Sequence, residues 1–433
     1  MAKPKDSAKA PKVKKPYHIK KADLHLDEYI EEQNSKNPAL LLQRAVAHLK
    51  TSFQFKVYLG LQFVAVLAGY GQAMLIIGLL WAMVANTGKR KDGERNVNSV
   101  PSRRAGTCPI GRGTMAKPER KIQLVRIAHV YYRHKDWEKA HEFLQDFGFE
   151  ECKRTDDKIY YRGYGREPFV YCLIKSDKDE FGGAGFVVES EEELNYASKI
   201  LPDATEPYEL KDAPGGGKCV TFKEPVDGFE WHLVYGQSPA PDERVLPTLT
   251  FNYPTEKHRP VGKFQRFEKK PAPVHKLGHF GLCVTDFNKA YEFYHTYFNI
   301  IDSELVHNEK GENVTVFSRL DRGKERVDHH CFFFFSGPRA PHVHHSSFET
   351  HDFDTQVLGH DWLRHKGYEN CWGVGRHIMG SQIFDYWFDP SKFVLEHYVD
   401  GDLLDNEYPV NLTPASPDNL HVWGPDLPPT FLT

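Results

Sequence analysis

The chain has 433 residues and a formal net charge of −3 at pH 7; 40% of its residues are hydrophobic and 27% are charged. Its length favours two or three domains, and its charge gives no support for nucleic-acid binding, which usually leaves a basic footprint. The seven cysteines form no CxxC pair and their number is odd, so they indicate neither a disulfide framework nor a thiolate metal site. Such cysteines favour a reducing, cytoplasmic setting for the catalytic part.

The N-terminal region differs in composition from the rest of the chain. Residues 1–56 open with eight lysines in the first 22 positions and are predicted to be a basic, partly disordered tail. Residues 57–88 contain no charged residue and are long enough for a helix that crosses a bilayer. This apolar helix predicts membrane association, and a buried helical hairpin is the alternative. Residues 89–118 are predicted to be a linker, so residues 1–114 are either an anchor or an extension without a part in the chemistry.

From Lys121 onward, short strand-like runs alternate with single helices in an order that repeats. His129 and His279 lie 150 residues apart, and similar local text follows each of them, KAHEFL at 139–144 and KAYEFY at 289–294. The spacing indicates an internal duplication.

A second duplication lies within the C-terminal half. His279 is followed seven residues later by Asp286–Phe287, and His345 is followed at the same distance by Asp352–Phe353. One βαβββ module is too small to bury its own core well, which favours pairing of the modules into curved sheets. The four predicted modules cover roughly 121–176, 180–237, 275–337 and 342–400.

The predicted fold class is therefore α+β, with four βαβββ modules paired into two curved-sheet domains behind an N-terminal extension that holds the apolar helix. The first domain covers 119–237 and the second covers 274–410. A linker rich in proline and charge covers 238–273, and a C-terminal tail covers 411–433. Because curved open sheets often pair across subunits, a homo-oligomer is also predicted.

The repeat selects candidate metal ligands in the second domain, where 15 of the 23 histidines follow residue 270. His279 and His345 hold equivalent positions at the start of their modules, and Glu396 lies in the apolar strand FVLEHYVD, where a charge needs a partner. Two histidines and one carboxylate form a facial triad that leaves three of six octahedral positions open. Iron(II) there could take both oxygens of a catechol and O2, with manganese(II) as the alternative cation. His344 competes with His345, and the Asp–Phe spacing decides for His345.

A further histidine follows from the same arithmetic. His279 and His330 are 51 residues apart, as are His345 and Glu396, so His330 is predicted to hold in its module the place of Glu396. It should point into the same site, either as a fourth ligand or as a free acid/base, a role that suits its near-neutral pKa.

The run from 344 to 403, which begins HHSSFETHDFD and ends FVLEHYVDGDL, resembles type I extradiol ring-cleaving dioxygenases, the catechol 2,3-dioxygenase-like enzymes of the vicinal oxygen chelate (glyoxalase–bleomycin resistance–dioxygenase) superfamily. The resemblance covers about residues 121–430 and is strong after residue 275. It implies that a small aromatic diol is opened beside its hydroxyl groups with insertion of both atoms of O2. By position it implies iron ligands at His279, His345 and Glu396, an acid/base at His330, and at His377 and Tyr386 two residues that bond to the substrate or the oxygen intermediate.

Two positions depart from the family pattern. Asp385 stands before the tyrosine where an apolar residue is expected, and Lys392 stands two residues after Pro390 where glycine or proline is expected. These departures concern the turn and its approach, so they bear on the substrate range and not on the ligands.

The N-terminal pair of modules is predicted to be a metal-free scaffold. His129 remains there, but Gly185 stands where His345 is matched, with His232 or Glu230 near the place of Glu396.

Two other functions compete with the dioxygenase prediction. A glyoxalase-like isomerase or lyase of the same fold would use His330 as a fourth ligand to Zn²⁺, Ni²⁺ or Mn²⁺ and would consume no O2. A metal-free binding protein is the second alternative, and the complete triad argues against it.

Overall fold

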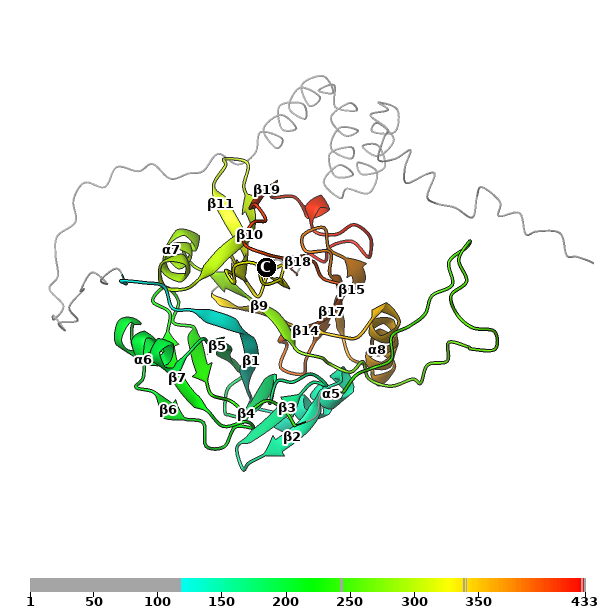
Figure 1. Ribbon diagram of the computed structural model, residues 1–433, viewed down its shortest axis with the longest axis horizontal. Coiled ribbons are helices and arrows are strands. Elements are labelled where there is room, and N and C mark those ends of the chain that lie inside the picture. The colour runs from blue at the N-terminus through cyan, green and yellow to red at the C-terminus, as the bar shows by residue number, and fades with distance from the viewer. Residues whose placement is uncertain (1–117, 242–243, 338, 340, 430, 432–433) are drawn as a thin grey trace, which may run out of the picture. The chain divides into compact units, whose positions relative to one another are not determined.

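The computed structural model in Figure 1 describes residues 118–241, 244–337, 339, 341–429 and 431. The predictions for residues 1–117, the basic tail, the apolar helix at 57–88 and nearly all of the first linker, lie outside the described residues. Within the described ranges, no helix is long and apolar enough to cross a membrane. Membrane association and the homo-oligomer stay predictions.

The first sheet has eight strands in the order β2-β3-β4-β1-β5-β8-β7-β6, and two helices accompany it. At its centre β1 runs antiparallel to β5, while β1 pairs parallel with β4 and β5 pairs parallel with β8. Each half is thus one strand, one helix and three further strands. The elements in chain order are β1 (Leu124–His134), α5 (Trp137–Phe147), β2 (Glu150–Arg154), β3 (Lys158–Arg162), β4 (Tyr171–Lys175), β5 (Glu180–Val188), α6 (Glu191–Ile200), β6 (Tyr208–Glu209), β7 (Lys218–Lys223) and β8 (Glu230–Tyr235).

The second sheet repeats this plan. Its order is β15-β16-β17-β14-β9-β13-β11-β10-β19, with β9 antiparallel to β14 at the centre and parallel partners β13 and β17 outside them. The predicted α+β fold of mixed sheets with few helices is therefore confirmed. The elements are β9 (Leu277–Val284), α7 (Phe287–Tyr297), β10 (Ile300–His307), β11 (Asn313–Leu320), β12 (Val327–Asp328), β13 (Phe332–Ser336), β14 (His342–Glu349), α8 (Phe353–Lys366), β15 (Asn370–Arg376), β16 (Ile383–Phe388), β17 (Val394–Val399), β18 (Leu403–Leu404), β19 (Asn411–Pro414) and the 3-10 helix η2 (Pro417–Asn419).

The repeated Asp–Phe pair of the sequence is a helix start. Asp286 and Asp352 are the N-caps of α7 and α8, and each side chain accepts a hydrogen bond from the backbone N–H three residues later. Such a cap satisfies one of the N–H groups that the first turn leaves unpaired. In both modules seven residues separate the histidine from the N-cap aspartate, so His279 and His345 lie at the same distance along the chain from the start of the following helix.

The two sheets share one hydrophobic core. The ring of Trp231 in β8 lies 5.5 Å from that of Phe280 in β9 and 5.0 Å from that of Phe332 in β13, measured between ring centroids. The hydroxyl groups of Tyr132 and Ser346 are 2.7 Å apart and join the central strands of the two sheets. The first sheet therefore supports the central strands of the second, which hold the candidate ligands.

Trp231→Ala is expected to lower the free energy of unfolding by about 3–5 kcal/mol, because it leaves a cavity at this shared core. Urea unfolding followed by circular dichroism measures the change. Phe264→Ala is the control, since that ring is 70% exposed; it should alter the free energy by no more than about 0.5 kcal/mol. Equal losses in the two variants would contradict a core that spans both sheets.

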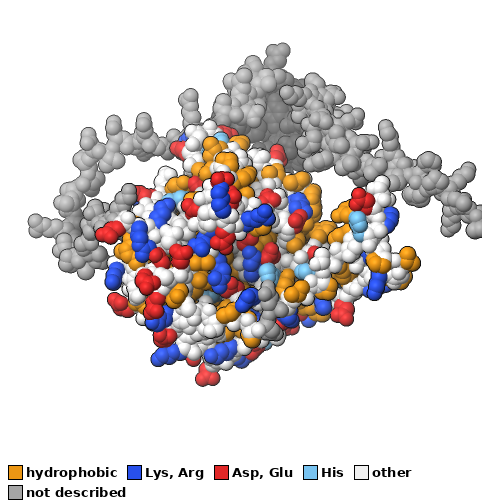
Figure 2. Space-filling model, in the orientation of Figure 1, with side chains coloured by type: hydrophobic (Ala, Val, Ile, Leu, Met, Phe, Trp, Pro, Cys, Tyr) orange, Lys and Arg blue, Asp and Glu red, His pale blue; other side chains and the backbone are white. Residues whose placement is uncertain are grey.

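The connection between the sheets carries little regular structure. Part of this connection extends away from the sheets at the right of Figure 1, and within it Asn252 and Lys257 form a β-bridge. On the face shown in Figure 2, Lys and Arg side chains alternate with Asp and Glu, so neither sign of charge gathers into one patch there.

The turn between β16 and β17 accounts for one departure from the family pattern. Lys392 has φ +69°, in the left-handed region that glycine adopts most easily. The glycine expected at this position would relieve that backbone, so the departure concerns a turn. Asp389 opens the same turn and accepts hydrogen bonds from the backbone N–H groups of Ser391 and Phe393.

Asp389 predicts a pH-dependent stability, because burial raises its pKa from 3.8 to about 7. Between pH 4 and pH 7 the unfolded chain ionises this carboxyl while the folded chain keeps it protonated, so its contribution to stability falls as the pH rises through that window. Asp389→Asn keeps the accepting oxygen and removes the titration. Relative to the wild type, this variant should gain on the order of 2–4 kcal/mol in unfolding free energy between pH 4.5 and pH 8. An equal difference at both pH values in urea unfolding would show that Asp389 does not titrate in this way.

Candidate metal centre

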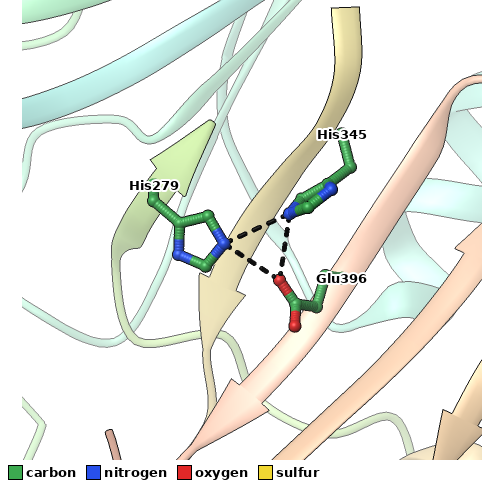
Figure 3. Close-up of side chains that lie close together, drawn as sticks. All are labelled: His279, His345 and Glu396. Atoms are coloured by element: carbon green, nitrogen blue, oxygen red, sulfur yellow. Dashed lines mark hydrogen bonds and ion pairs between the residues drawn. The ribbon is translucent and has the colours of Figure 1, made fainter. Parts of the chain in front are cut away.

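Three neighbouring strands present the candidate ligands on one face of the second sheet. His279 lies in β9, His345 in β14 and Glu396 in β17, and these strands are adjacent in the sheet (Figure 1). Ser347 of β14 pairs with His279 on one side and with Glu396 on the other, which brings all three strands to the same level. Figure 3 shows the three side chains pointing toward one another.

The three side chains form a compact, buried cluster. The Nε2 atoms of His279 and His345 are 3.2 Å apart, and Oε2 of Glu396 lies 3.1 Å from the first and 3.3 Å from the second. The exposed fractions of the three residues are 3%, 4% and 0%. Among the described residues this is the one group of His, Cys, Asp or Glu side chains arranged to hold a metal ion.

The cluster fits a divalent cation. Both carboxylate oxygens of Glu396 are buried, and neither has a hydrogen-bond partner of adequate geometry. Burial acts to raise the pKa of Glu396, but hydrogen bonding and charge at His279 and His345 hold it well below its ordinary value, so the carboxylate is ionised and a proton lies where the three groups meet, in the place that a cation would take. A buried anion whose oxygens lack well-formed hydrogen bonds is costly, and a bound cation would lower that cost. Two imidazole nitrogens and one carboxylate converging on a common point are a donor set that divalent metals accept.

A chain of hydrogen bonds fixes the tautomer of His345. Nε2 of His344 lies 2.5 Å from the carbonyl oxygen of Phe431 and must donate to it. Burial, followed by the neighbouring His345, lowers the pKa of His344 to about 3, so this imidazole is neutral and its Nδ1 accepts. That Nδ1 is 2.8 Å from Nδ1 of His345, which therefore carries the hydrogen. His345 is left with a bare Nε2 facing the cluster, as a metal ligand requires, while His344 points to the C-terminal segment.

His330 lies beside the cluster without joining it. It precedes β13, and its ring centroid is 4.1 Å from that of His279. Burial, followed by the charges of His279 and His329, lowers its pKa well below the ordinary value, so the imidazole is neutral. Its Nδ1 is 3.1 Å from Nδ1 of His329, whose Nε2 lies 3.6 Å from the carboxylate of Glu304.

The spacing that singled out His330 does not match the strand register. Position 281 of β9 is level with Phe333 of β13, while the equivalent Ser347 of β14 is level with Glu396. Phe333 is thus the structural counterpart of Glu396, and His330 reaches the site from the loop three residues earlier. The equal spacings hide a difference in loop length.

His377 and Tyr386 are joined to each other. Nδ1 of His377 lies 2.7 Å from the carbonyl oxygen of Leu420 and donates to it, so Nε2 accepts a hydrogen bond of 2.8 Å from the hydroxyl of Tyr386. Burial lowers the pKa of His377 to about 4 and raises the pKa of Tyr386 well above its ordinary value. Tyr386 pairs with Glu396 across the β16–β17 ladder, so both residues are oriented by backbone register.

Asp385, the second departure from the family pattern, is fully buried and hydrogen-bonded. Its Oδ1 accepts from His360 and Asn370, each at 3.0 Å, and its Oδ2 accepts from Nε1 of Trp387 at 2.6 Å. Because neighbouring residues of a strand face opposite sides, Asp385 points away from the site that Tyr386 faces. Its partners explain how an acid is tolerated at a position where an apolar residue is expected.

A pocket of about 280 Å³ opens on the cluster. His279, His330, His345, His377 and Tyr386 line it together with mainly apolar side chains. Segment 413–420 and Phe431 close one side, although the sequence suggested a tail at 411–433. In the structure β19 of this segment pairs with β10 at the edge of the sheet. The repeat carried no signal for these residues, because they follow the fourth module.

The first sheet lacks an equivalent cluster. His129 pairs with Gly185 as His279 pairs with Ser347, so by register the counterpart of His345 is Gly183 rather than Gly185. His232, level with Gly185, holds the place of Glu396 and is bonded to Thr221 and to the carbonyl oxygen of Gly182.

Part of the chain matches one protein-family model, and the chain is similar in sequence to proteins named as catechol-cleaving enzymes. Residues 276–396 match the model of the Glyoxalase/Bleomycin resistance protein/Dioxygenase superfamily. Metapyrocatechase 2 of Cupriavidus necator is 28% identical over 242 residues, which are 55% of this chain and 59% of that protein, so the match spans less than two thirds of the relative. Biphenyl-2,3-diol 1,2-dioxygenase of Paraburkholderia xenovorans is 24% identical over 285 residues, 65% of this chain and 87% of that protein.

Solved structures show the same fold. The Mn(II)-bound glyoxalase from Novosphingobium aromaticivorans superposes with a TM-score of 0.60 at 21% identity, over 72% of this chain and 95% of that one. Homoprotocatechuate 2,3-dioxygenase from Brevibacterium fuscum superposes with a TM-score of 0.60 at 16% identity, over 73% and 94%. The resemblance to extradiol dioxygenases and their superfamily, predicted from the sequence, is confirmed.

Proposed function

We propose that this chain is a metal-dependent extradiol dioxygenase, which opens a catechol-type ring beside its two hydroxyl groups and inserts both atoms of O2. The observation that carries the proposal is the buried anion of Glu396 facing two imidazoles, both of which line an apolar pocket. The relatives named as dioxygenases support the same class of reaction.

His279, His345 and Glu396 would hold the metal ion. Two neutral imidazoles and one carboxylate leave a divalent cation with a net charge of +1 and, in octahedral geometry, three open positions. We propose Fe(II), which when bound supplies a point where catechol and O2 meet and electron density can pass between them. Mn(II) accepts the same ligands and is the alternative.

His330 is the proposed acid/base. It lies against His279 and lines the pocket, so it is placed to take the proton that a catechol hydroxyl loses and to return it later. Of the two facing Nδ1 atoms of His329 and His330, one carries the hydrogen and the other accepts it, which holds the His330 ring in place.

His377 and Tyr386 are proposed to bond to the oxygen atoms of the reacting molecules when the hydrogen bond between these two side chains opens. Each already has a fixed orientation, His377 through the carbonyl of Leu420 and Tyr386 through His377. Groups that are oriented before the substrate arrives lose little entropy on binding it.

A glyoxalase-like isomerase or lyase is the second candidate, favoured by the likeness to the Mn(II)-bound glyoxalase and by the closeness of His330 to His279. It would require His330 as a fourth metal ligand. His330 is not part of the group of three that converges on one point, which favours the dioxygenase.

Anaerobic loading of the full chain with Fe(II), followed by addition of O2 and a panel of catechols, tests the proposal. We expect one O2 consumed per diol, with a yellow ring-opened product. A metal-loaded protein that uses no O2 with any catechol but isomerises a glutathione hemithioacetal would instead establish the glyoxalase-like reaction.

A further inference from the structure

We propose that the pocket selects neutral catechols with an apolar substituent and rejects catechols that carry a carboxylate. This inference rests on the proposed function and names its substrate class. None of the described residues that line the pocket is Lys, Arg, Asp or Glu. A carboxylate substituent that points away from the metal centre into this pocket therefore meets no positively charged Lys or Arg side chain.

The wall beyond the cluster is built of apolar side chains from several elements. Val306 of β10, Phe317 of β11 and Leu420 beside η2 face the pocket, and the ring of Phe317 is stacked on that of Phe333 at 5.3 Å between centroids. Burying one methylene against such a wall favours binding by about fourfold. A pocket of about 280 Å³ lies near the lower end of ligand-site volumes, so the substituent must be small.

Two arginines that are close in sequence to pocket residues are already engaged elsewhere. Arg319 follows Phe317 by two residues, but it is buried and donates to the carbonyl oxygens of Asp302 and Tyr408. Arg376 precedes His377, and it donates to the carbonyl oxygen of Ser381 and to the carboxylate of Asp400. Neither can turn to a bound carboxylate without giving up its present partners, and for the buried Arg319 that loss is costly.

A buried carboxylate without a partner is strongly disfavoured, whereas an apolar group of the same shape is not. The test therefore uses three catechols that match in shape: 4-isobutylcatechol, 3,4-dihydroxyphenylacetamide and 3,4-dihydroxyphenylacetate. The first is apolar, the second polar and neutral, and the third charged. Two readouts on the full chain loaded with Fe(II) are kcat/KM from O2 uptake and Kd from an anaerobic optical titration.

We expect 4-isobutylcatechol to exceed 3,4-dihydroxyphenylacetate by at least about tenfold in both readouts, with the amide between them. Equal or reversed preference in Kd would overturn the inference. If the preference appears in Kd but no catechol consumes O2, the substrate class stands and the dioxygenase proposal fails. If none of the three binds, both fail.

A positive charge placed in the pocket should weaken this preference for the apolar catechol. Thr315 of β11 lines the pocket, whereas Asn313 of the same strand is exposed and does not. Thr315→Lys is expected to shift the Kd ratio toward the carboxylate by about tenfold, and Asn313→Lys should leave it unchanged. Leu420→Lys provides a second pocket variant should Thr315→Lys not fold. Equal shifts in Asn313→Lys and in the folded pocket variant would assign the effect to the net charge of the protein and overturn the role of the pocket.

Discussion

His345→Ala is expected to abolish tight metal binding and, with it, all O2 consumption. His345 is the middle of three donors that meet within hydrogen-bond distance, and its Nε2 carries no hydrogen. Without it the cation keeps only one imidazole and one carboxylate from the cluster. Elemental analysis after desalting should fall from about one Fe per chain to background, since a third of the protein ligands is lost.

His344→Ala is the matched control for this variant. His344 is adjacent in sequence and fixes the tautomer of His345 through the Nδ1 contact, but it faces Phe431. Loss of such a supporting partner typically weakens metal binding by 10–100-fold, so His344→Ala should bind metal weakly and regain activity at higher Fe(II). Full metal in His345→Ala together with none in His344→Ala would assign the ligand to His344.

Thermal unfolding gives a second readout that needs no turnover. A metal that binds only the folded chain at 100 times its Kd stabilises it by about 2.7 kcal/mol. We expect the wild type to show this gain on addition of Fe(II) under anaerobic conditions and His345→Ala to show none. A gain of equal size in both proteins would place the bound metal elsewhere.

The sequence predicted this cluster because its repeat is also a structural unit. The Asp–Phe pairs are helix caps, and each cap lies seven residues after a histidine of the preceding strand. Two such strands, β9 and β14, then pair antiparallel at the centre of the sheet and bring His279 and His345 together. Periodicity, capping and pairing thus act on the same residues, and the fold of each module could be predicted for that reason.

The other parts of the site could not be predicted, because they depend on long-range packing, which leaves no local pattern in the sequence. His330 reaches the site from the loop before β13, and the strand position predicted for it is occupied by Phe333. Leu420 and Phe431 lie beyond the last module, and their backbone carbonyls orient His377 and His344. A segment without strand periodicity gives no sign that its carbonyl groups will fix the tautomers of two imidazoles.

His330→Gln is the variant that separates the two candidate functions. If His330 is an acid/base, the variant should keep one Fe(II) per chain and lose about 10²–10⁴-fold in kcat, the range for removal of a positioned proton carrier. The Kd for 4-isobutylcatechol in an anaerobic titration should change little, because glutamine fills a similar volume. Fe(II) retained with kcat lost would support a dioxygenase in which His330 moves a proton.

His329→Gln provides the comparison. His329 touches His330 through Nδ1 and has Glu304 near its Nε2, so it acts on His330 by holding its ring. It should lower kcat less than His330→Gln does, and should leave metal content unchanged. A fourth metal ligand behaves differently: if His330→Gln lost its metal while His329→Gln kept it, the imidazole of His330 would be coordinated, the three open positions would fall to two, and the glyoxalase-like reaction would be favoured.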